Sequence, residues 1–284
     1  MNVCIYHGVD LDGWCSGAIW KEVHANESID MIGLNYGQEI PWDRLHGNKV
    51  TLLDFCFQPI SEFIKLLQIA HSVTWIDHHE SAIKAWLQCE RPPNACPLIT
   101  SLDTTKAACE LAWEFYHISA MPTGVFLLGD YDCWRHSNNA TMPYQMGMWQ
   151  FEMDPIHDDA MERWRKVFAG MDRFHEQVIQ NGQIILSYQQ KQNAKTAKAI
   201  WFPVEFAGHK WMAINQGGVN SQCWDSVWND DFDGKLGFVR SHNHWTISLY
   251  SETIDCSVIA KANGGGGHVG ASGFQCQELP FLKC

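Results

Sequence analysis

Acidic and imidazole side chains recur at the ends of short apolar runs in the first half of the chain. They are His7, Asp10 and Asp12 after residues 3–6, Asp54 after 50–53, Asp77, His78 and His79 after 73–76, and Asp130 after 125–128. Carboxylates brought together repel by roughly 4 kcal/mol per pair at 4 Å when the effective dielectric is near 20, so such a cluster needs cations. A mixture of carboxylate and imidazole ligands without thiolates favours Mn²⁺, Mg²⁺ or Fe²⁺ over a structural zinc ion. Two such ions that share a bridging carboxylate can activate a water and clamp a phosphate oxygen, which is the chemistry of phosphoester hydrolysis.

The elements that must position these side chains form a regular alternation over the first 150 residues. The predicted strands are residues 3–6, 50–53, 73–76 and 125–128, and the predicted helices are residues 16–24, 60–70, 81–87 and 104–116. Strands that alternate with helices are typical of a parallel sheet with both faces covered. Because the carboxyl ends of parallel strands meet at one edge of the sheet, we expect the ionisable side chains to lie together there.

The pattern changes in the second half of the chain. A long polar stretch without proline covers about residues 158–198, and its apolar residues near helical spacing indicate a helical connector. The β-like segments that follow are residues 200–206, 211–215, 236–239 and 245–250. The sequence therefore predicts an α/β protein with a mainly parallel sheet over residues 1–155, a helical connector over 156–198, and a smaller C-terminal α/β domain over 199–284.

Motifs across the chain resemble those of the DHH phosphoesterases. The four motifs of the first domain are HGVDLDG from residue 7, LLDF from residue 52, WIDHHES from residue 75 and LLGDYDCW from residue 127. In the second domain GGGGHVGASGF, from residue 264, resembles the signature of the DHHA1 substrate-binding domain. The resemblance covers almost the whole chain. It implies a DHH-like catalytic domain followed by a DHHA1-like domain, as in the stand-alone members that degrade short RNA or linear dinucleotides.

The resemblance also implies ligands for two divalent ions, with Mn²⁺ preferred and Mg²⁺ or Fe²⁺ as alternatives. The implied metal ligands are His7 and Asp10 for one ion, Asp12, His78 and Asp130 for the other, and Asp54 as the bridge between them. By the same resemblance, the catalytic residues are His78, His79, which would face the scissile phosphate, and Asp77, which would orient its neighbours. Asp132 competes with Asp130 for the ligand position. We prefer Asp130 because Trp134 follows it by four residues, as an aromatic residue does in the family's motif.

The glycine run is the candidate substrate-binding loop. Glycines let backbone N–H groups approach an anion closely, and His268 beside them can donate to a phosphate. Many family members carry an arginine before the serine in the preceding strand, where this chain has Tyr250 before Ser251. Tyr250 can stack on a base or donate one hydrogen bond, and Arg240 and His242 are candidates for the missing charge. The predicted substrate-binding residues are Gly265, Gly266, Gly267, His268, Ser251 and Tyr250.

The activity implied by the resemblance is a phosphodiesterase that hydrolyses short nucleic acids to mononucleotides through a water activated by two metal ions. Linear dinucleotides and short oligonucleotides are the expected substrates, and cyclic dinucleotides are a further option. The alternatives are a 3′-phosphoadenosine phosphate phosphatase, another small phosphoester hydrolase and a non-catalytic nucleotide-binding sensor. An inorganic pyrophosphatase has a similar metal motif but lacks the glycine-rich loop.

Composition excludes several other classes of protein. The 32 acidic residues outnumber the 20 basic ones and give a net charge of −12, which is unfavourable for gripping long duplex DNA. Eleven cysteines without a C-x-x-C pair favour reduced thiols. The N-terminal segment does not have the pattern of a signal peptide, and no segment approaches the roughly 18 uninterrupted apolar residues of a membrane span. We expect a cytoplasmic monomer or homodimer that binds dinucleotides or short oligonucleotides.

Overall fold

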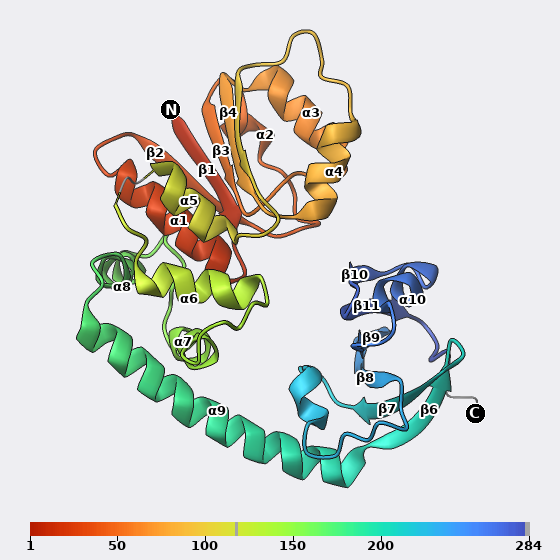
Figure 1. The fold of residues 1–284 in the computed structure, drawn as a ribbon. Helices are drawn as coiled ribbons and strands as arrows, with labels where there is room; N and C mark the ends of the chain where they lie inside the picture. The colour runs from red at the N-terminus through yellow and green to blue at the C-terminus, as the bar shows by residue number, and fades with distance from the viewer. Residues whose placement is uncertain (117–118, 282–284) are drawn as a thin grey trace. The chain divides into compact units, whose positions relative to one another are not determined.

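The computed structural model describes residues 1–116 and 119–281 (Figure 1). The chain divides into two compact units, Met1–Ile185 and Leu186–Cys284. The boundary lies within helix α9 (Asp172–Ile200), which together with α8 (Asp158–Phe168) occupies most of the stretch expected to be a connector.

The N-terminal unit contains a five-stranded sheet in the order β2-β1-β3-β4-β5. The strands are β1 (Asn2–His7), β2 (Ile29–Leu34), β3 (Lys49–Leu53), β4 (Ser72–Asp77) and β5 (Leu98–Leu102). All neighbouring strands pair in parallel, which confirms the predicted α/β class and the three strands expected at 3–6, 50–53 and 73–76. The two strands that the sequence did not indicate, β2 and β5, are the edges of the sheet. Most of their residues are partly or fully exposed, so neither strand carries a continuous apolar run.

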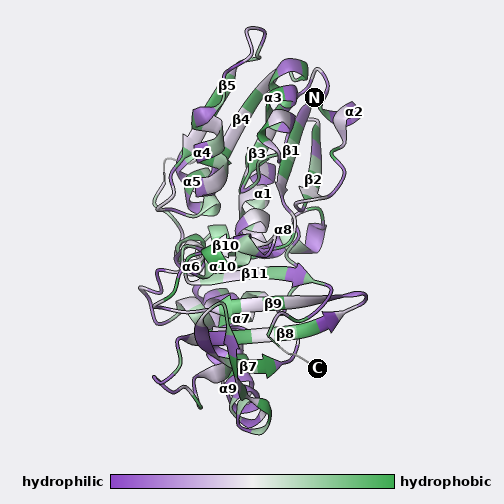
Figure 2. Cartoon of the chain, turned by 90° about the vertical axis from the view of Figure 1, so that its right-hand side faces the viewer, coloured by the Kyte–Doolittle hydropathy of each residue, from purple (hydrophilic) through white to green (hydrophobic). Residues whose placement is uncertain are grey.

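Helices cover both faces of this sheet (Figure 1). They are α1 (Leu11–Val23) and α5 (Ala108–Tyr116) on one face and α2 (Trp42–Leu45), α3 (Ile60–Ile69) and α4 (Glu80–Gln88) on the other. The helices α6 (Thr123–Asp132), α7 (Thr141–Met148) and α8 pack in the same core as α1 and α5. Because successive side chains of a strand point to opposite faces, Cys4 and Tyr6 of β1 pack in one core with α1 and α5. Val3 and Ile5 pack in a second core with α3 and α4. Figure 2 shows hydrophobic segments, coloured green, along the strands of this sheet.

One predicted strand is wrong. Residues 125–128 belong to helix α6, where Val125, Leu127 and Leu128 are buried in the core that also contains α1 and α5. A run of four apolar residues has no periodicity that separates a buried strand from a buried helical turn. As a result, Asp130 lies in the last turn of a helix and does not follow a strand of the sheet.

A buried histidine makes the N-terminal unit sensitive to acid. His175 in α9 is 8% exposed and stacks on Tyr144, with ring centroids 5.4 Å apart. Burial lowers the pKa of His175 below its ordinary value of 6.5. His175 therefore binds a proton more readily in the unfolded chain than in the folded chain. The free energy of unfolding should decrease as the pH falls below about 6.5.

We expect His175→Phe to reduce this acid sensitivity. Between pH 7.5 and 5.5 the wild type should lose more of its free energy of unfolding than the variant, by on the order of 1 kcal/mol. Urea denaturation at the two pH values measures the difference, and His157→Gln, at an exposed position in the same unit, is the control. Equal losses in wild type and His175→Phe would contradict the prediction.

The second unit is a six-stranded mixed sheet in the order β10-β11-β9-β8-β7-β6. Its strands are β6 (Phe202–Phe206), β7 (His209–Asn215), β8 (Gly234–Ser241), β9 (His244–Tyr250), β10 (Gly266–His268) and β11 (Ala271–Cys276), and its helices are α10 (Cys256–Ala262) and the 3-10 turn η1 (Ser221–Trp224). Only the β7–β8 pair is parallel among the strands described. The glycine run forms the turn into β10 and its first residues. A Cβ on Gly265 would lie 2.1 Å from the carbonyl oxygen of Gly273, so this approach of β10 to β11 requires glycine.

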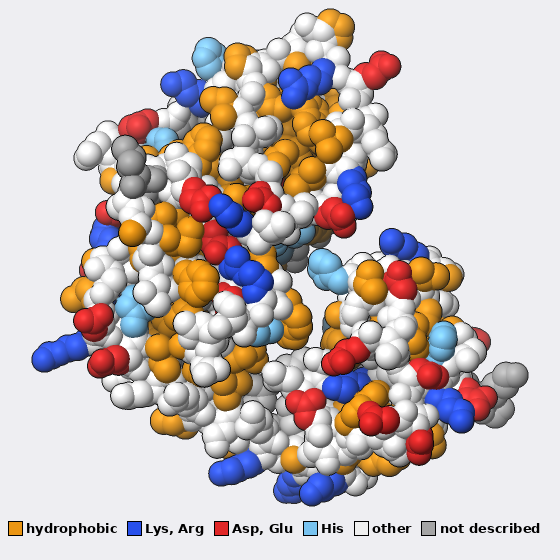
Figure 3. Space-filling view, viewed as in Figure 1, with side chains coloured by type: hydrophobic (Ala, Val, Ile, Leu, Met, Phe, Trp, Pro, Cys, Tyr) orange, Lys and Arg blue, Asp and Glu red, His pale blue; other side chains and the backbone are white. Residues whose placement is uncertain are grey.

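Among residues 1–116 and 119–281, no helix combines the length and the apolar character needed to cross a membrane. On the face of the molecule seen in Figure 3, acidic and basic side chains are interspersed.

Candidate metal centre

The ionisable residues that end the central strands lie together at one edge of the parallel sheet. His7 is the last residue of β1, Asp54 follows β3, and Asp77 is the last residue of β4 with His78 and His79 after it. Neighbouring strands β1, β3 and β4 are in parallel register, so their carboxyl ends coincide.

The N-terminus of α1 brings two more carboxylates to the same edge. Asp10 caps this helix by accepting a hydrogen bond from the backbone N–H of Gly13 at 2.9 Å, and Asp12 lies in the first turn. The helix begins very close to β1, because a Cβ on Gly13 would lie 2.0 Å from the carbonyl oxygen of His7. Glycine at position 13 is therefore what allows both Asp10 and Asp12 to approach the strand ends.

Asp54 occupies the centre of the cluster. It is 1% exposed. Its backbone φ of 54° lies in the left-handed region, which residues other than Gly, Asn and Asp rarely adopt. Its Oδ1 lies 3.2 Å from Nε2 of His78 and 3.6 Å from Nδ1 of His79, while Oδ2 lies 3.5 Å from Nδ1 of His7. Although buried, Oδ1 has no hydrogen-bond partner among the described residues. A carboxylate whose two oxygens face different imidazoles has the arrangement of a ligand shared between two ions.

One candidate group of ligands consists of His7, Asp10 and Asp54. Nδ1 of His7 lies 2.7 Å from Oδ2 of Asp10. Burial alone would lower the pKa of His7, but its hydrogen bonds with Asp10 and Asp54 raise it to about 10. Without a cation, a proton on His7 therefore balances the charge of these carboxylates. A divalent ion would displace that proton, as expected at a site built from imidazole and carboxylate ligands.

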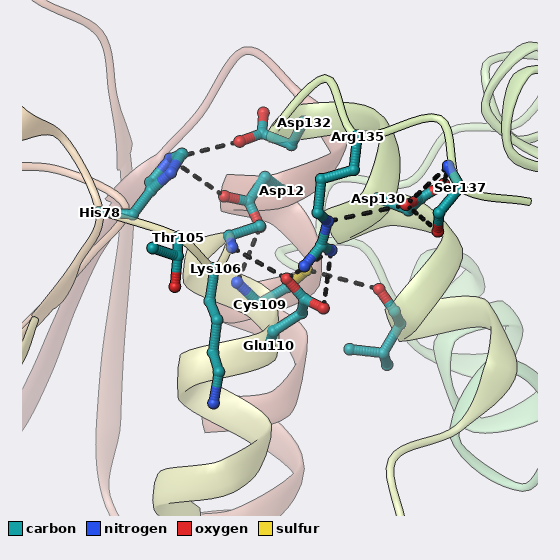
Figure 4. A network of polar contacts seen from close by, with 12 residues as sticks. Asp12, His78, Thr105, Lys106, Cys109, Glu110, Asp130, Asp132, Arg135 and Ser137 are labelled. Atoms are coloured by element: carbon teal, nitrogen blue, oxygen red, sulfur yellow. Dashed lines mark hydrogen bonds and ion pairs between the residues drawn. The ribbon is translucent and has the colours of Figure 1, made fainter. Parts of the chain in front are cut away.

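A second group surrounds His78. Its Nε2 lies 3.3 Å from Oδ2 of Asp132 and 3.7 Å from Oδ2 of Asp12, in addition to its approach to Asp54 (Figure 4). Burial and the neighbouring charge of Asp54 raise the pKa of Asp12 to about 7. Burial and the charge of Asp12 do the same for Asp132, whose pKa is about 7. These raised pKa values show carboxylates that are crowded together without enough positive charge.

Asp12 is also anchored to α5. Its two oxygens accept hydrogen bonds from the backbone N–H groups of Ala108 at 2.9 Å and Cys109 at 2.7 Å (Figure 4). These amides belong to the first turn of α5, where N–H groups have no partner within the helix. The contact fixes the position of the Asp12 carboxylate and leaves Oδ2 facing His78.

The structure places Asp132, and not the expected Asp130, beside His78. Asp130 is fully buried and points away from His78, toward the segment that follows α6 (Figure 4). Its carboxylate accepts hydrogen bonds from the hydroxyl of Ser137 at 2.6 Å, from the hydroxyl of Thr141 and from the backbone N–H of Ser137. These hydrogen bonds outweigh the effect of burial and lower its pKa. On a helix with 3.6 residues per turn, side chains two positions apart point in directions that differ by about 200°. Only one of Asp130 and Asp132 can therefore face the cluster.

Asp77 holds the two histidines that follow it. The Oδ1 of Asp77 accepts hydrogen bonds from the backbone N–H groups of His78 at 2.7 Å and His79 at 3.0 Å, and it lies 2.7 Å from Nδ1 of His79. Its Oδ2 accepts a hydrogen bond from the indole N–H of Trp75 at 3.0 Å. Burial would raise the pKa of Asp77, but its contacts with His79 lower it. With Nδ1 of His79 directed at Asp77, the other ring nitrogen of His79 is available for a ligand.

Two residues beside the cluster were not identified as site residues from the sequence. Asn35 and Tyr36 follow edge strand β2; Oδ1 of Asn35 lies 3.4 Å from Nε2 of His7. The ring of Tyr36 stacks on Phe55 with centroids 4.8 Å apart and lies 5.7 Å from the ring of His7. Tyr36 is 36% exposed, so it provides an aromatic surface beside the cluster. Both residues could have been identified from their position directly after a parallel strand, but the sequence did not indicate strand β2.

The predicted substrate-binding residues all belong to the second unit. His268 is exposed at the end of β10, directly after the glycine run. The hydroxyl of Ser251 donates to the carbonyl oxygen of Asp233 at 2.7 Å, and the hydroxyl of Tyr250 donates to that of Val219 at 3.0 Å. The prediction that Tyr250 could donate to a phosphate therefore needs correction, because its only O–H is used inside the unit.

No protein-family model matches the chain. An uncharacterized protein of Acanthamoeba polyphaga mimivirus is 20% identical over 317 residues, which cover all of this chain and 70% of that protein.

Several solved structures share the fold, and one of them is described as a DHH domain. The pGpG-specific phosphodiesterase PggH from Vibrio cholerae aligns with a TM-score of 0.54 at 10% identity, over 97% of this chain and 93% of that one. The DHH domain of a member of the s1p family of ribosomal proteins aligns with a TM-score of 0.55 at 12% identity, over 99% of this chain and 82% of that one. An exopolyphosphatase-related protein from Bacteroides fragilis aligns with a TM-score of 0.50 at 12% identity, over 98% and 87% of the two chains. The resemblance seen in the motifs is thus confirmed at the level of the fold.

Proposed function

We propose that this chain, which folds as the DHH-domain proteins do, is a metal-dependent phosphodiesterase that hydrolyses short nucleic acids. The observation that carries the proposal is the buried carboxylate of Asp54, whose oxygens face His7 on one side and His78 and His79 on the other. The first ion would be held by His7, Asp10 and Asp54, and the second by Asp12, Asp54, His78 and Asp132. The unpartnered Oδ1 of Asp54 and the raised pKa values of Asp12 and Asp132 are what a site that fits cations should have. Bound divalent ions would supply Lewis-acid activation of a water and neutralise charge at the phosphate.

The residues around the ion ligands would position the substrate. His79, with Nδ1 directed at Asp77 and at 3.6 Å from Asp54, would present its other nitrogen to the scissile phosphate. Asp77 would keep that ring in a fixed orientation and tautomer, which is the usual role of a carboxylate behind a functional histidine. Mixed carboxylate and imidazole donors fit Mn²⁺, with Mg²⁺ and Fe²⁺ as alternatives.

Three observations favour a short substrate. The chain has a net charge of −12, which is unfavourable for many simultaneous phosphate contacts. One protein that shares its fold is a pGpG-specific phosphodiesterase. The exposed ring of Tyr36 beside the cluster can stack on a nucleobase, which is a sequence-tolerant interaction. We therefore propose linear dinucleotides or short oligonucleotides as substrates, cleaved to mononucleotides.

A substrate panel tests the proposed function. The purified protein with Mn²⁺ would be incubated with linear dinucleotides, cyclic dinucleotides, a five-nucleotide RNA, 3′-phosphoadenosine phosphate and pyrophosphate. We expect selective cleavage of linear dinucleotides or the short RNA, and loss of that cleavage in His78→Ala. Turnover of pyrophosphate alone, or equal turnover by His78→Ala, would overturn the proposal. Selective turnover of 3′-phosphoadenosine phosphate would keep metal-dependent phosphoester hydrolysis but replace phosphodiester cleavage by phosphomonoester cleavage.

The glycine-rich loop is proposed to contact the substrate, and His268→Ala tests this role. We expect the variant to raise KM for the preferred substrate by on the order of tenfold, because one charge-assisted or neutral hydrogen bond to phosphate is lost. The content of bound metal should not change. Kinetics and metal analysis of His268→Ala would be compared with those of His209→Ala, a partly exposed histidine of the same unit. Unchanged kinetics in His268→Ala would remove this histidine from substrate binding.

A further inference from the structure

A cysteine lies among the candidate ligands of the second ion. Cys133 directly follows Asp132 at the C-terminal end of α6, and its thiol is free. Its sulfur, a ring nitrogen of His78 and a carboxylate oxygen of Asp132 all lie within 4.8 Å of one another. The three atoms could therefore reach one common ion without rearrangement of the backbone.

Both residues lie at the C-terminal end of α6. Cys133 is the C-cap of the helix, and Trp134 after it has a backbone φ of 55°, the left-handed conformation that commonly ends helices. Asp132 and Cys133 themselves are still on the helical path, so their side chains diverge by about 100°, and His78 lies where a donor atom of each can reach it. Asp132 and Cys133 thus form a pair at the helix end.

A second observation, on Asp54, points to a ligand beside His78. Oδ1 of Asp54 lies 3.2 Å from Nε2 of His78, is buried, and has no hydrogen-bond partner among the described residues. It is therefore an unpartnered acceptor directed at the same histidine that Cys133 and Asp132 approach. Nitrogen, oxygen and sulfur donors converge here.

We propose that Cys133 is a ligand of the second metal ion and makes that position selective for thiophilic divalent cations such as Zn²⁺ and Co²⁺. The inference rests on the proposed metal centre and revises the expectation of a thiolate-free ligand set. When the ion binds, the thiol releases its proton to solvent as the sulfur–metal bond forms, so the step needs no oxidant or reductant. Thiolate is a softer donor than carboxylate, and it strengthens binding of Zn²⁺ and Co²⁺ far more than binding of Mn²⁺ or Mg²⁺.

Optical titration with Co²⁺ tests the proposal without relying on activity. The full-length reduced protein, freed of metal by chelation, would be titrated with Co²⁺ while its near-ultraviolet and visible absorption are recorded. We expect the visible bands of bound Co²⁺ together with a near-ultraviolet sulfur-to-cobalt charge-transfer band. In Cys133→Ser the charge-transfer band should disappear while Co²⁺ still binds, about tenfold or more weakly. Competition with Mn²⁺ should show a smaller loss of affinity for Mn²⁺.

Matched variants separate this cysteine from the others. Cys96→Ser, at a partly buried free cysteine in the N-terminal unit, should keep the charge-transfer band, and His78→Ala should lose it. A band that persists in Cys133→Ser, or bound Co²⁺ without the band in the wild type, would overturn the role of Cys133 and leave the metal centre standing. Failure of the wild type to bind Co²⁺ or Mn²⁺ at all would instead overturn the metal centre and the inference with it.

Discussion

Asp54→Asn is expected to abolish phosphodiester hydrolysis, with a fall in kcat/KM of roughly 10³-fold or more, and to reduce the bound divalent ions from two to one or none. The amide keeps the size of the side chain and tolerates the backbone φ of 54°. It removes the negative charge and one of the two ligand oxygens that face His7 and His78. Steady-state kinetics with the best substrate, together with metal analysis of dialysed protein, would measure both effects.

An exposed carboxylate provides the control for this experiment. Asp43→Asn, in the short helix α2, changes the net charge by the same amount at an exposed position and should leave activity and metal content unchanged. Full metal occupancy with normal turnover in Asp54→Asn would show that this carboxylate bridges nothing. Loss of activity with two ions still bound would limit its role to the chemical step.

The second large effect separates two aspartates that are two residues apart. Asp132→Ala is expected to lower kcat/KM by about 10²-fold or more and to weaken metal binding, with little change in the free energy of unfolding. Asp130→Ala should instead destabilise the N-terminal unit by about 1–3 kcal/mol, because it leaves the buried hydroxyl of Thr141 without its acceptor and removes the hydrogen bonds from Ser137. Urea denaturation of the metal-free proteins, combined with kinetics of the folded variants, measures this contrast.

The opposite pattern would restore the original assignment. If Asp130→Ala kept its stability and lost metal, or if Asp132→Ala retained full activity, Asp130 would have to be the ligand. The conservative variant Asp130→Asn guards against complete unfolding, because its amide oxygen can still accept one of the hydrogen bonds from Ser137. It should be folded and active, although less stable than the wild type.

The parts of the fold that could be predicted from sequence are those where burial leaves a clear pattern. The central strands β1, β3 and β4 are covered on both faces and appear as short apolar runs, so their ends could be recognised. Most residues of the edge strands β2 and β5 are partly buried or exposed, so these strands carry no continuous apolar run and gave no such signal. Tyr36 follows β2 and was not identified as a site residue for the same reason.

The choice between Asp130 and Asp132 could not be made from the sequence because it depended on a secondary-structure assignment. With residues 125–128 as a strand, the first acidic residue after it is the natural ligand. These residues form a helix instead, so the direction in which each side chain points around the helix decides which one reaches the cluster. The carboxylate that faces His78 is Asp132. Cys133 was overlooked because a single cysteine without a C-x-x-C partner carries no spacing signal; only the distances around His78 reveal it.

The left-handed backbone of Asp54 also bears on how this centre can be lost in evolution. Only glycine, asparagine and aspartate adopt such a conformation at low cost, so most replacements here would disturb the end of β3 as well as the metal ligands. An Asp codon differs by one base from an Asn codon and by one base from a Gly codon, and either exchange would silence the chemistry while sparing the backbone. Relatives that have become binding proteins should therefore carry Asn or Gly at this position more often than Ala or Ser. That single position offers a sequence marker for telling enzymes from their inactive descendants.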